Sequence, residues 1–206
     1  MSTVTKHPGS PVVLIVLDGW GESTERDGNA ILQARTPIYR ELRERYPSSL
    51  LTTCGEAVGL PAGQMGNSEV GHMNLGAGRV VFQDLTRIDQ AIATGDLSRN
   101  QTISRVFDTC KTGSRALHLV GLLSDGGVHA HQRHLHALIR LAADRGVRRV
   151  FIHAITDGRD TAPTGGAAYL GVLQNVCAKV GIGRIATICG RYHAMDRDQR
   201  WERTRR

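Results

Sequence analysis

The chain has 206 residues, of which 40% are hydrophobic and 22% charged, and these proportions are typical of a soluble globular protein. A formal net charge of +7 would suit nucleic acid, but no basic run with interleaved aromatics is present, so an anionic metabolite is the expected partner. The apolar runs are too short to span a bilayer, and the four cysteines form no CxxC pair. We therefore expect a reduced, cytoplasmic, monomeric protein that binds a small molecule and neither nucleic acid nor membrane.

The first third of the chain predicts a strand, a helix and a glycine-rich stretch. PVVLIVL (residues 11–17) is a run rich in β-branched residues without alternation, typical of a strand buried on both faces, and Asp18 follows it in a turn. In TPIYRELRERYP, Pro37 stands at the first position of a predicted helix whose apolar residues recur every four positions. After Arg79, VVFQDLTRIDQAIATGDL predicts a connection and then another helix.

The remaining chain alternates strand and helix patterns, which indicates an α/β protein with a parallel sheet. ALHLVGLLSDGG, RRVFIHAITDGRD and GRIATICGRYHAMDRDQRWERTRR each begin with a predicted strand, and HQRHLHALIRLAADRG and GGAAYLGVLQNVCAKVG predict helices between them. Ligands of such sheets bind beyond the carboxyl ends of the strands. The polar residues at the predicted strand ends are therefore the preferred site candidates: Asp18, Asp125, Asp157 to Asp160, and Arg191.

The glycine-rich stretch GQMGNSEVGHMNLGAGR (residues 63–79) fits neither a P-loop nor a nucleophile elbow. Two interpretations stay open. Asn67 or Ser68 caps a helix, or Ser68 lies at a helix N-terminus that favours phosphate, with a base or metal to assist its weakly nucleophilic hydroxyl. Asp18 is likewise either an Asx turn or a ligand for Mg²⁺ or Mn²⁺.

Histidines and arginines supply the candidate anion-binding groups. His129 follows a strand end and could donate to a phosphate oxygen, whereas no carboxylate set supports a metal cluster at the neighbouring His131 and His134, and His136 is expected to be an ordinary surface or core residue. Guanidinium groups bind phosphate and carboxylate bidentately, and three occupy suitable strand-end or loop positions. These are Arg159, Arg191 and Arg197, while Arg200, Arg203, Arg205 and Arg206 are interpreted as solvated surface charge.

Taken together, five blocks resemble one family, the cofactor-independent (2,3-bisphosphoglycerate-independent) phosphoglycerate mutases. The blocks are VLIVLDGWG, GLPAGQMGNSEVGHMNLGAGRVV, LLSDGGVHAH, HAITDGRDTAP and GRYHAMDRDQRWER, and they occur in the family's order over almost the whole chain. The resemblance implies part of an alkaline-phosphatase-like parallel sheet in residues 1–82. Residues 83–206 would be part of an inserted α/β substrate-binding domain.

The resemblance also implies an activity and a site. Members of the family interconvert 3-phosphoglycerate and 2-phosphoglycerate in glycolysis and gluconeogenesis, with two Mn²⁺ ions, a phosphoserine intermediate and no 2,3-bisphosphoglycerate. Ser68 would be the phosphorylated nucleophile, and both Asp18 and Ser68 would be ligands of one metal ion. The positions that match the family's substrate contacts are His129, Arg159, Asp160, Arg191 and Arg197.

One departure from the family is its length, because members are more than twice as long. Later arginine and lysine contacts and the downstream metal-binding Asp and His residues have no counterpart in these 206 residues, so we expect a partial sheet with exposed apolar edges and no turnover by this chain alone. One alternative is a non-catalytic remnant that still binds phosphoglycerate. Another phosphomutase or phosphatase of the same superfamily is a weaker one, because DGRDT and GRYHAMDRD argue against it.

Overall fold

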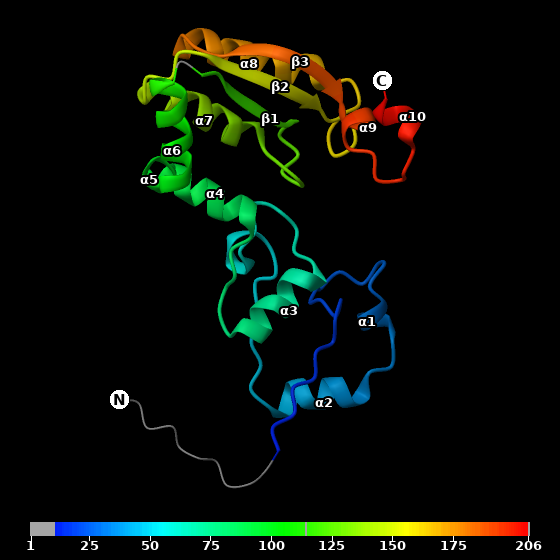
Figure 1. Ribbon diagram of the computed structural model, residues 1–206. Helices are drawn as coiled ribbons and strands as arrows, with labels where there is room; N and C mark the ends of the chain where they lie inside the picture. The colour runs from blue at the N-terminus through cyan, green and yellow to red at the C-terminus, as the bar shows by residue number, and fades with distance from the viewer. Residues whose placement is uncertain (1–10, 114, 206) are drawn as a thin grey trace, which may run out of the picture. The chain divides into compact units, whose positions relative to one another are not determined.

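The computed structural model describes residues 11–113 and 115–205, and within them the chain divides into two compact units (Figure 1). The serine unit consists of the described residues up to Val58 together with Gly63–Val81. The sheet unit consists of Gly59–Ala62 and the described residues from Phe82 onward.

The sheet unit is built on three parallel strands in the order β1-β2-β3. β1 (Leu117–Leu123) pairs with β2 (Val150–Thr156), which pairs with β3 (Arg184–Gly190). The crossover helices are α7 (Gln132–Asp144) and α8 (Gly166–Val180). The α/β fold with a parallel sheet predicted from the alternation of patterns is therefore confirmed for this part of the chain.

Both crossover helices pack on the same face of the sheet. One cluster joins Leu123 and Ile152 of the strands to Ile139 of α7 and Leu173 of α8, all of them fully buried. These strand residues alternate along the pleat with residues of the opposite face, where Val120 is 69% exposed. The sheet unit is therefore a two-layer structure within the described residues.

Further helices flank this core. Phe107 of α6 (Gln101–Thr112) packs into a second buried cluster with Leu117, Ala142, Val147 and Val150, and the Asn100 side chain caps α6 by accepting from two backbone N–H groups. The other helices of the sheet unit are α4 (Asp84–Ala93), α5 (Asp96–Arg99), α9 (Arg191–Ala194) and α10 (Trp201–Thr204). None of the helices in the described residues is long and apolar enough to cross a membrane.

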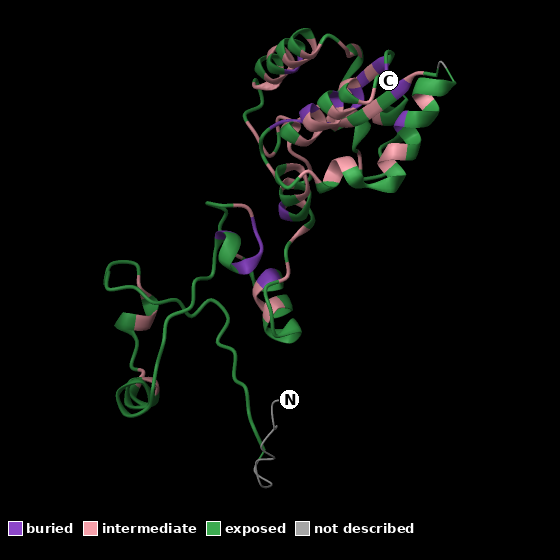
Figure 2. Cartoon of the chain, turned by 90° about the vertical axis from the view of Figure 1, so that its left-hand side faces the viewer, coloured by how far each residue is buried: buried purple, intermediate pink, exposed green. Residues whose placement is uncertain are grey.

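The serine unit contains short helices joined by extended chain and has little core. Its elements are α1 (Ala30–Gln33), α2 (Pro37–Arg45), the 3-10 turn η1 (Gly55–Val58) and α3 (Ser68–Ala77). Figure 2 shows buried residues on the strands and helices of the sheet unit, whereas most of the serine unit is exposed. The predicted helix at Pro37 is confirmed, although its apolar residues Ile38 and Leu42 are exposed.

The strand predicted at residues 11–17 is wrong for this structure. The segment is extended but belongs to no sheet, and Ile15 is 76% exposed. A strand requires a neighbour to accept and donate its backbone hydrogen bonds, and all strands of the described residues belong to the sheet unit. The exposed apolar side chains of this segment agree with the expectation of a partial sheet.

Candidate functional site: an arginine-lined cavity and a serine–aspartate pair

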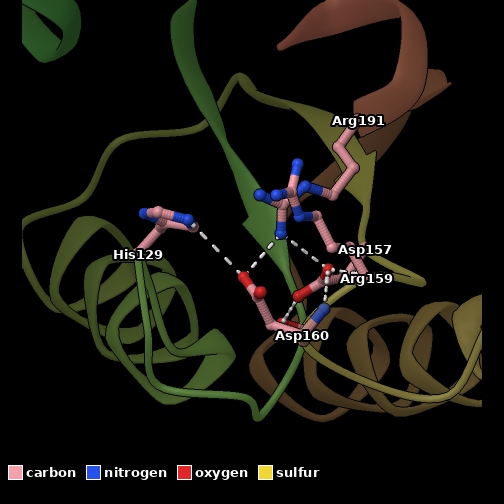
Figure 3. A network of polar contacts seen from close by, with 6 residues as sticks. His129, Asp157, Arg159, Asp160 and Arg191 are labelled. Carbon is pink, nitrogen blue, oxygen red and sulfur yellow. Dashed lines mark hydrogen bonds and ion pairs between the residues drawn. The ribbon is translucent and has the colours of Figure 1, made fainter. Parts of the chain in front are cut away.

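The carboxyl ends of the three strands each supply a polar residue to one network (Figure 3). Ser124 follows β1, Asp157 follows β2, and Arg191 follows β3. The strands are parallel, so these three positions meet at the same edge of the sheet, as expected for an α/β ligand site.

Asp157 lies at the centre of this network. Its Oδ2 accepts a hydrogen bond from the Ser124 hydroxyl at 2.7 Å, and its Oδ1 accepts one from Arg191 Nη1 at 2.8 Å. The backbone N–H groups of Arg159 and Asp160 also donate to Oδ1, each at 3.1 Å. Burial opposes ionisation of Asp157, but the hydrogen bonds, led by that from Arg191, outweigh it and lower its pKa to about 2.

Asp160 extends the network toward solvent. Its Oδ2 accepts a hydrogen bond from Arg191 Nη1 at 2.6 Å and lies 3.6 Å from His129 Nε2. Its side chain is 17% exposed, whereas that of Asp157 is 1% exposed. The hydrogen bonds that Arg191 donates to Asp160 and, with a smaller effect, to Asp157 raise the pKa of Arg191 above its ordinary value, so this guanidinium stays charged.

These residues line a cavity of about 610 Å³ in the sheet unit. All five residues that the family resemblance marks as substrate contacts lie on its wall: His129, Arg159, Asp160, Arg191 and Arg197. Arg191 is held by two carboxylates, but neither Arg159 nor Arg197 has an ion-pair partner for its guanidinium within residues 11–113 and 115–205. Two cationic groups of the cavity are thus available to an anion.

Arg203, on the wall of the same cavity, differs from its interpretation by sequence. Arg203 is not a solvated surface charge, because its side chain is only 18% exposed, pairs with Asp196 at 3.2 Å and lies over the Tyr192 ring at 4.1 Å. Asp196 also accepts the backbone N–H of Arg200 at 2.8 Å, which closes the turn that carries Arg197. Arg200 and Arg205 are exposed as predicted, and Arg206 lies outside the described residues.

The remaining histidines of the HAHQRHLHAL stretch have structural contacts. His131 caps α7, accepting the Arg133 N–H, while Arg133 and His134 both contact Asp89 of α4. His136 is buried, and burial lowers its pKa. The interpretation of His136 as an ordinary core residue agrees with this placement.

In the serine unit, the Ser68 hydroxyl donates to Asp18 Oδ2 at 2.7 Å. Ser68 is the first residue of α3, and Asn67 is its cap, with its side chain accepting the Val70 N–H at 3.0 Å. His72 Nδ1 lies 2.8 Å from the Ser68 carbonyl oxygen and 3.2 Å from its hydroxyl oxygen. The pair lines a cavity of about 500 Å³.

The donor set of this second cavity fits part of a hard-cation site. A carboxylate and a hydroxyl oxygen already 2.7 Å apart are ligands that Mn²⁺ or Mg²⁺ accepts. The described residues hold no group of three or more His, Cys, Asp or Glu side chains placed to bind a metal ion. Asp18 and Ser68 could therefore contribute to such a site but not complete it.

Reasoning from sequence missed the supporting residues of both sites. The sequence predicts Asp157 only as part of a strand end, and its local patterns indicate no role for Ser124 or Asp196. His72 stands four positions after Ser68 on α3, a helical spacing that could have indicated its contact. The sequence signals for the two aspartates are weaker. Asp157 stands in an Asp-Gly step after a predicted strand, and Asp196 lies inside a charged segment.

The fold and the cavity define an α/β protein with an arginine-lined cavity at the carboxyl edge of a parallel sheet. A family model described as "BPG-independent PGAM N-terminus (iPGM_N)" matches residues 88–206, more than half of the chain. The chain therefore belongs to the family of cofactor-independent phosphoglycerate mutases, as its sequence blocks predicted.

Individual relatives agree with this assignment. The 2,3-bisphosphoglycerate-independent phosphoglycerate mutase of Nostoc punctiforme is 54% identical over 98% of this chain, and that of Moorella thermoacetica is 55% identical over 95%. A crystal structure of Leishmania mexicana phosphoglycerate mutase at low cobalt concentration matches with a TM-score of 0.66 and 37% identity over 93% of this chain. The chain spans 38% of the length of the two relatives and 36% of the Leishmania chain.

Proposed function

We propose that this chain forms the substrate-binding part and the phosphoserine part of an enzyme that interconverts 3-phosphoglycerate and 2-phosphoglycerate. The single observation that carries the proposal is the cavity of the sheet unit, whose wall gathers His129, the Arg191–Asp160 pair and two arginines that have no ion-pair partner among the described residues. Phosphoglycerate carries a phosphate and a carboxylate on a short hydroxylated carbon chain. The cavity offers complementary groups for each of these features.

The roles of the cavity residues follow from their partners. Arg159 and Arg197 would bind the phosphate and the carboxylate, because their guanidinium groups are not already engaged by acidic side chains in the described residues. Asp160 would accept hydrogen bonds from the substrate hydroxyls. His129 and Arg191, which face Asp160, would donate to the phosphate oxygens once substrate is bound.

In the serine unit, Ser68 would accept the phosphoryl group. Its hydroxyl already donates to Asp18, so a carboxylate is in place to draw the proton away as the oxygen attacks. Its place at the start of α3 adds backbone N–H groups and a helix dipole that favour the resulting phosphate. A divalent cation such as Mn²⁺, held partly by Asp18 and Ser68, would lower the pKa of the hydroxyl and offset phosphoryl charge.

The domain assignment belongs to the same proposal. Residues 1–82 would be the first part of the alkaline-phosphatase-like domain, and residues 83–206 the first part of the inserted substrate domain. The division of the chain between Val81 and Phe82 supports this assignment, and so does the presence of the serine pair and the arginine cavity in different units. We also propose a place in glycolysis and gluconeogenesis, in the cytoplasm.

Titration calorimetry with 3-phosphoglycerate tests the binding half of the proposal. Loss of a charge-assisted bidentate contact costs about 1.5–3 kcal/mol, so Arg159→Ala is expected to weaken binding roughly 10- to 100-fold. Arg200→Ala is the matched control, since Arg200 is exposed and does not line the cavity. Equal losses in both variants would show nonspecific attraction to a basic protein instead of binding in the cavity.

Mass spectrometry tests the chemical half. After incubation with 3-phosphoglycerate and Mn²⁺, a phosphate on Ser68 that Ser68→Ala removes would identify the serine as the acceptor, although the incomplete metal site of the described residues favours no turnover by this chain alone. Binding without any phosphate on Ser68 would favour the non-catalytic, phosphoglycerate-binding alternative for this chain.

A further inference from the structure

Asp157 has no surface left for a ligand although it lies on the cavity wall. Its side chain is 1% exposed, and four donors already occupy its two oxygens. A carboxylate has about four acceptor positions, so the hydrogen-bonding capacity of Asp157 is filled by the protein itself. Direct contact with substrate is therefore excluded for this side chain in the described arrangement.

Its four donors come from every strand that borders the site. The Ser124 hydroxyl follows β1, the N–H groups of Arg159 and Asp160 belong to the turn after β2, and the Arg191 guanidinium follows β3. Three of these donors belong to residues whose side chains line the cavity. One buried carboxylate thus holds the backbone from which the Arg159 and Asp160 side chains project, and the guanidinium at the end of the Arg191 side chain.

Asp160, the other aspartate of the DGRD motif, differs in each of these respects. Among the described residues its side chain accepts a hydrogen bond only from Arg191, lies 3.6 Å from His129 and stays partly exposed to the cavity. Asp160 can therefore exchange its protein partners for a ligand, whereas Asp157 cannot do so without breaking the strand-end network.

We propose that Asp157 is the positioning residue of this cavity: it holds Arg191 and the turn that carries Arg159 and Asp160, and it does not touch the substrate. This inference rests on the proposed function, because phosphoglycerate is the ligand for which the cavity is prepared. Arg191 keeps its orientation through Asp157 while Asp160 turns to the substrate hydroxyls. The low pKa of Asp157 keeps its carboxylate ionised through the physiological range, so this hold does not vary with pH there.

The first test follows Arg191 directly by NMR of the arginine side-chain N–H groups in the full 206-residue chain, with Arg191→Lys to assign the signal. The Asp157 carboxylate offers about four acceptor positions to its four donors, whereas the amide in Asp157→Asn offers a single oxygen. Exchange of the Arg191 guanidinium hydrogens should therefore accelerate roughly tenfold. Asp160→Asn is the control. Its amide oxygen can still accept from Arg191, which is its hydrogen-bond donor in the described residues, and Asp157 remains, so Arg191 exchange should accelerate less than in Asp157→Asn.

The second test uses the sign of a binding change. Removal of a negative charge beside an anion site strengthens phosphate binding if the effect is Coulombic alone. Positioning predicts the opposite, so Asp157→Asn should weaken 3-phosphoglycerate binding roughly tenfold by calorimetry. In an Arg191→Gln background most of that loss should disappear, because the Arg191 guanidinium that Asp157 holds is already absent.

The outcomes separate this inference from the proposed function. Unchanged Arg191 exchange in Asp157→Asn, or tighter 3-phosphoglycerate binding, overturns the positioning role. If the wild-type chain binds no 3-phosphoglycerate, the proposed function fails for this chain, and the NMR comparison still decides whether Asp157 holds Arg191. Should Asp157→Asn not fold, Ser124→Ala with the same NMR measurement replaces it: loss of the hydroxyl that donates to Asp157 Oδ2 should loosen the carboxylate and accelerate Arg191 exchange by less than tenfold. Arg191 exchange at the wild-type rate in Ser124→Ala then overturns the inference.

Discussion

Asp18 and Asp157 stand in the same local sequence pattern but in different structural settings. Each follows a run of apolar residues and precedes a glycine. The run before Asp157 is β2, paired on both sides, and it delivers its aspartate to a network of four hydrogen bonds. The run before Asp18 is exposed and unpaired, and in the described residues Asp18 has the Ser68 hydroxyl as its hydrogen-bond partner.

This difference shows that a local apolar pattern marks a possible strand, whereas pairing with neighbouring strands determines whether the strand forms. β2 lies between two strands whose backbones satisfy its own, and α7 and α8 cover its apolar side chains. A β-branched run is equally compatible with residues 11–17, yet a strand without neighbours leaves its backbone groups to water. The accuracy of a strand prediction therefore depends on whether the partner strands are present.

The largest expected effect contrasts two isoleucines of these runs. Ile152→Ala removes a fully buried side chain from the cluster of β1, β2, α7 and α8, and should lower the free energy of unfolding by about 2–5 kcal/mol. Ile15→Ala, at an exposed position, should change it by no more than about 0.5 kcal/mol. Urea unfolding followed by far-UV circular dichroism measures both. A similar cost at the two positions would mean that residues 11–17 pack as a strand in solution.

Much of the sheet unit could be predicted because its signals are local and repeated. The three strands and both crossover helices followed from apolar runs, helical spacing and turn residues. The exposed segment 11–17 could not be predicted in the same way. Its pattern is typical of a strand that is covered on both faces, but the pattern does not say which other segments cover it.

The sequence predicts charged residues that line the cavity, but it does not predict the residues that hold them in place. Arg159 and Arg191 carry charge at strand ends and suggest anion binding by their chemistry alone. Asp157 has a nearly fully buried side chain and accepts hydrogen bonds from Ser124 and Arg191, which lie 33 and 34 positions away in the sequence. Arg203 looks like surface charge until Tyr192 and Asp196 are seen beside it. Such partners depend on tertiary packing, which no local pattern encodes.

The next effect in size is a pH dependence specific to the sheet unit. Asp157 has a pKa of about 2 in the folded chain and about 3.9 when unfolded, so its ionised form favours folding. This contribution, roughly 2 kcal/mol, is complete above pH 4 and is lost as the pH falls from about 4 to 2. Asp157→Asn should flatten the pH profile of urea unfolding in that window.

The matched control for this titration is Asp144→Asn. Asp144 is exposed at the end of α7 and has no ion pair within the described residues, so its replacement should leave the acid-sensitive part of the profile in place. A profile that stays unchanged in Asp157→Asn would show that other carboxylates cause the acid loss.

The smallest effect tests whether the two units respond separately to the same kind of change. Asn67 and Asn100 each cap a helix through the side-chain oxygen, at α3 of the serine unit and α6 of the sheet unit. Replacement of such a cap by alanine costs about 1 kcal/mol. Because α6 inserts Phe107 into the core, Asn100→Ala should lower the free energy of the main unfolding transition by that amount.

Asn67→Ala should act locally instead, because Val70 is the buried residue of α3 and little else in that helix is covered. Amide hydrogen exchange in α3 should accelerate about fivefold, the factor that 1 kcal/mol represents, with little change in the main transition. Ser68 is the first residue of this helix, so its contact with Asp18 should loosen in the same variant. If Asn67→Ala shifts the main transition as far as Asn100→Ala does, the two units unfold as one, and the contrast between Asp18 and Asp157 reflects their local contacts instead of a difference in stability.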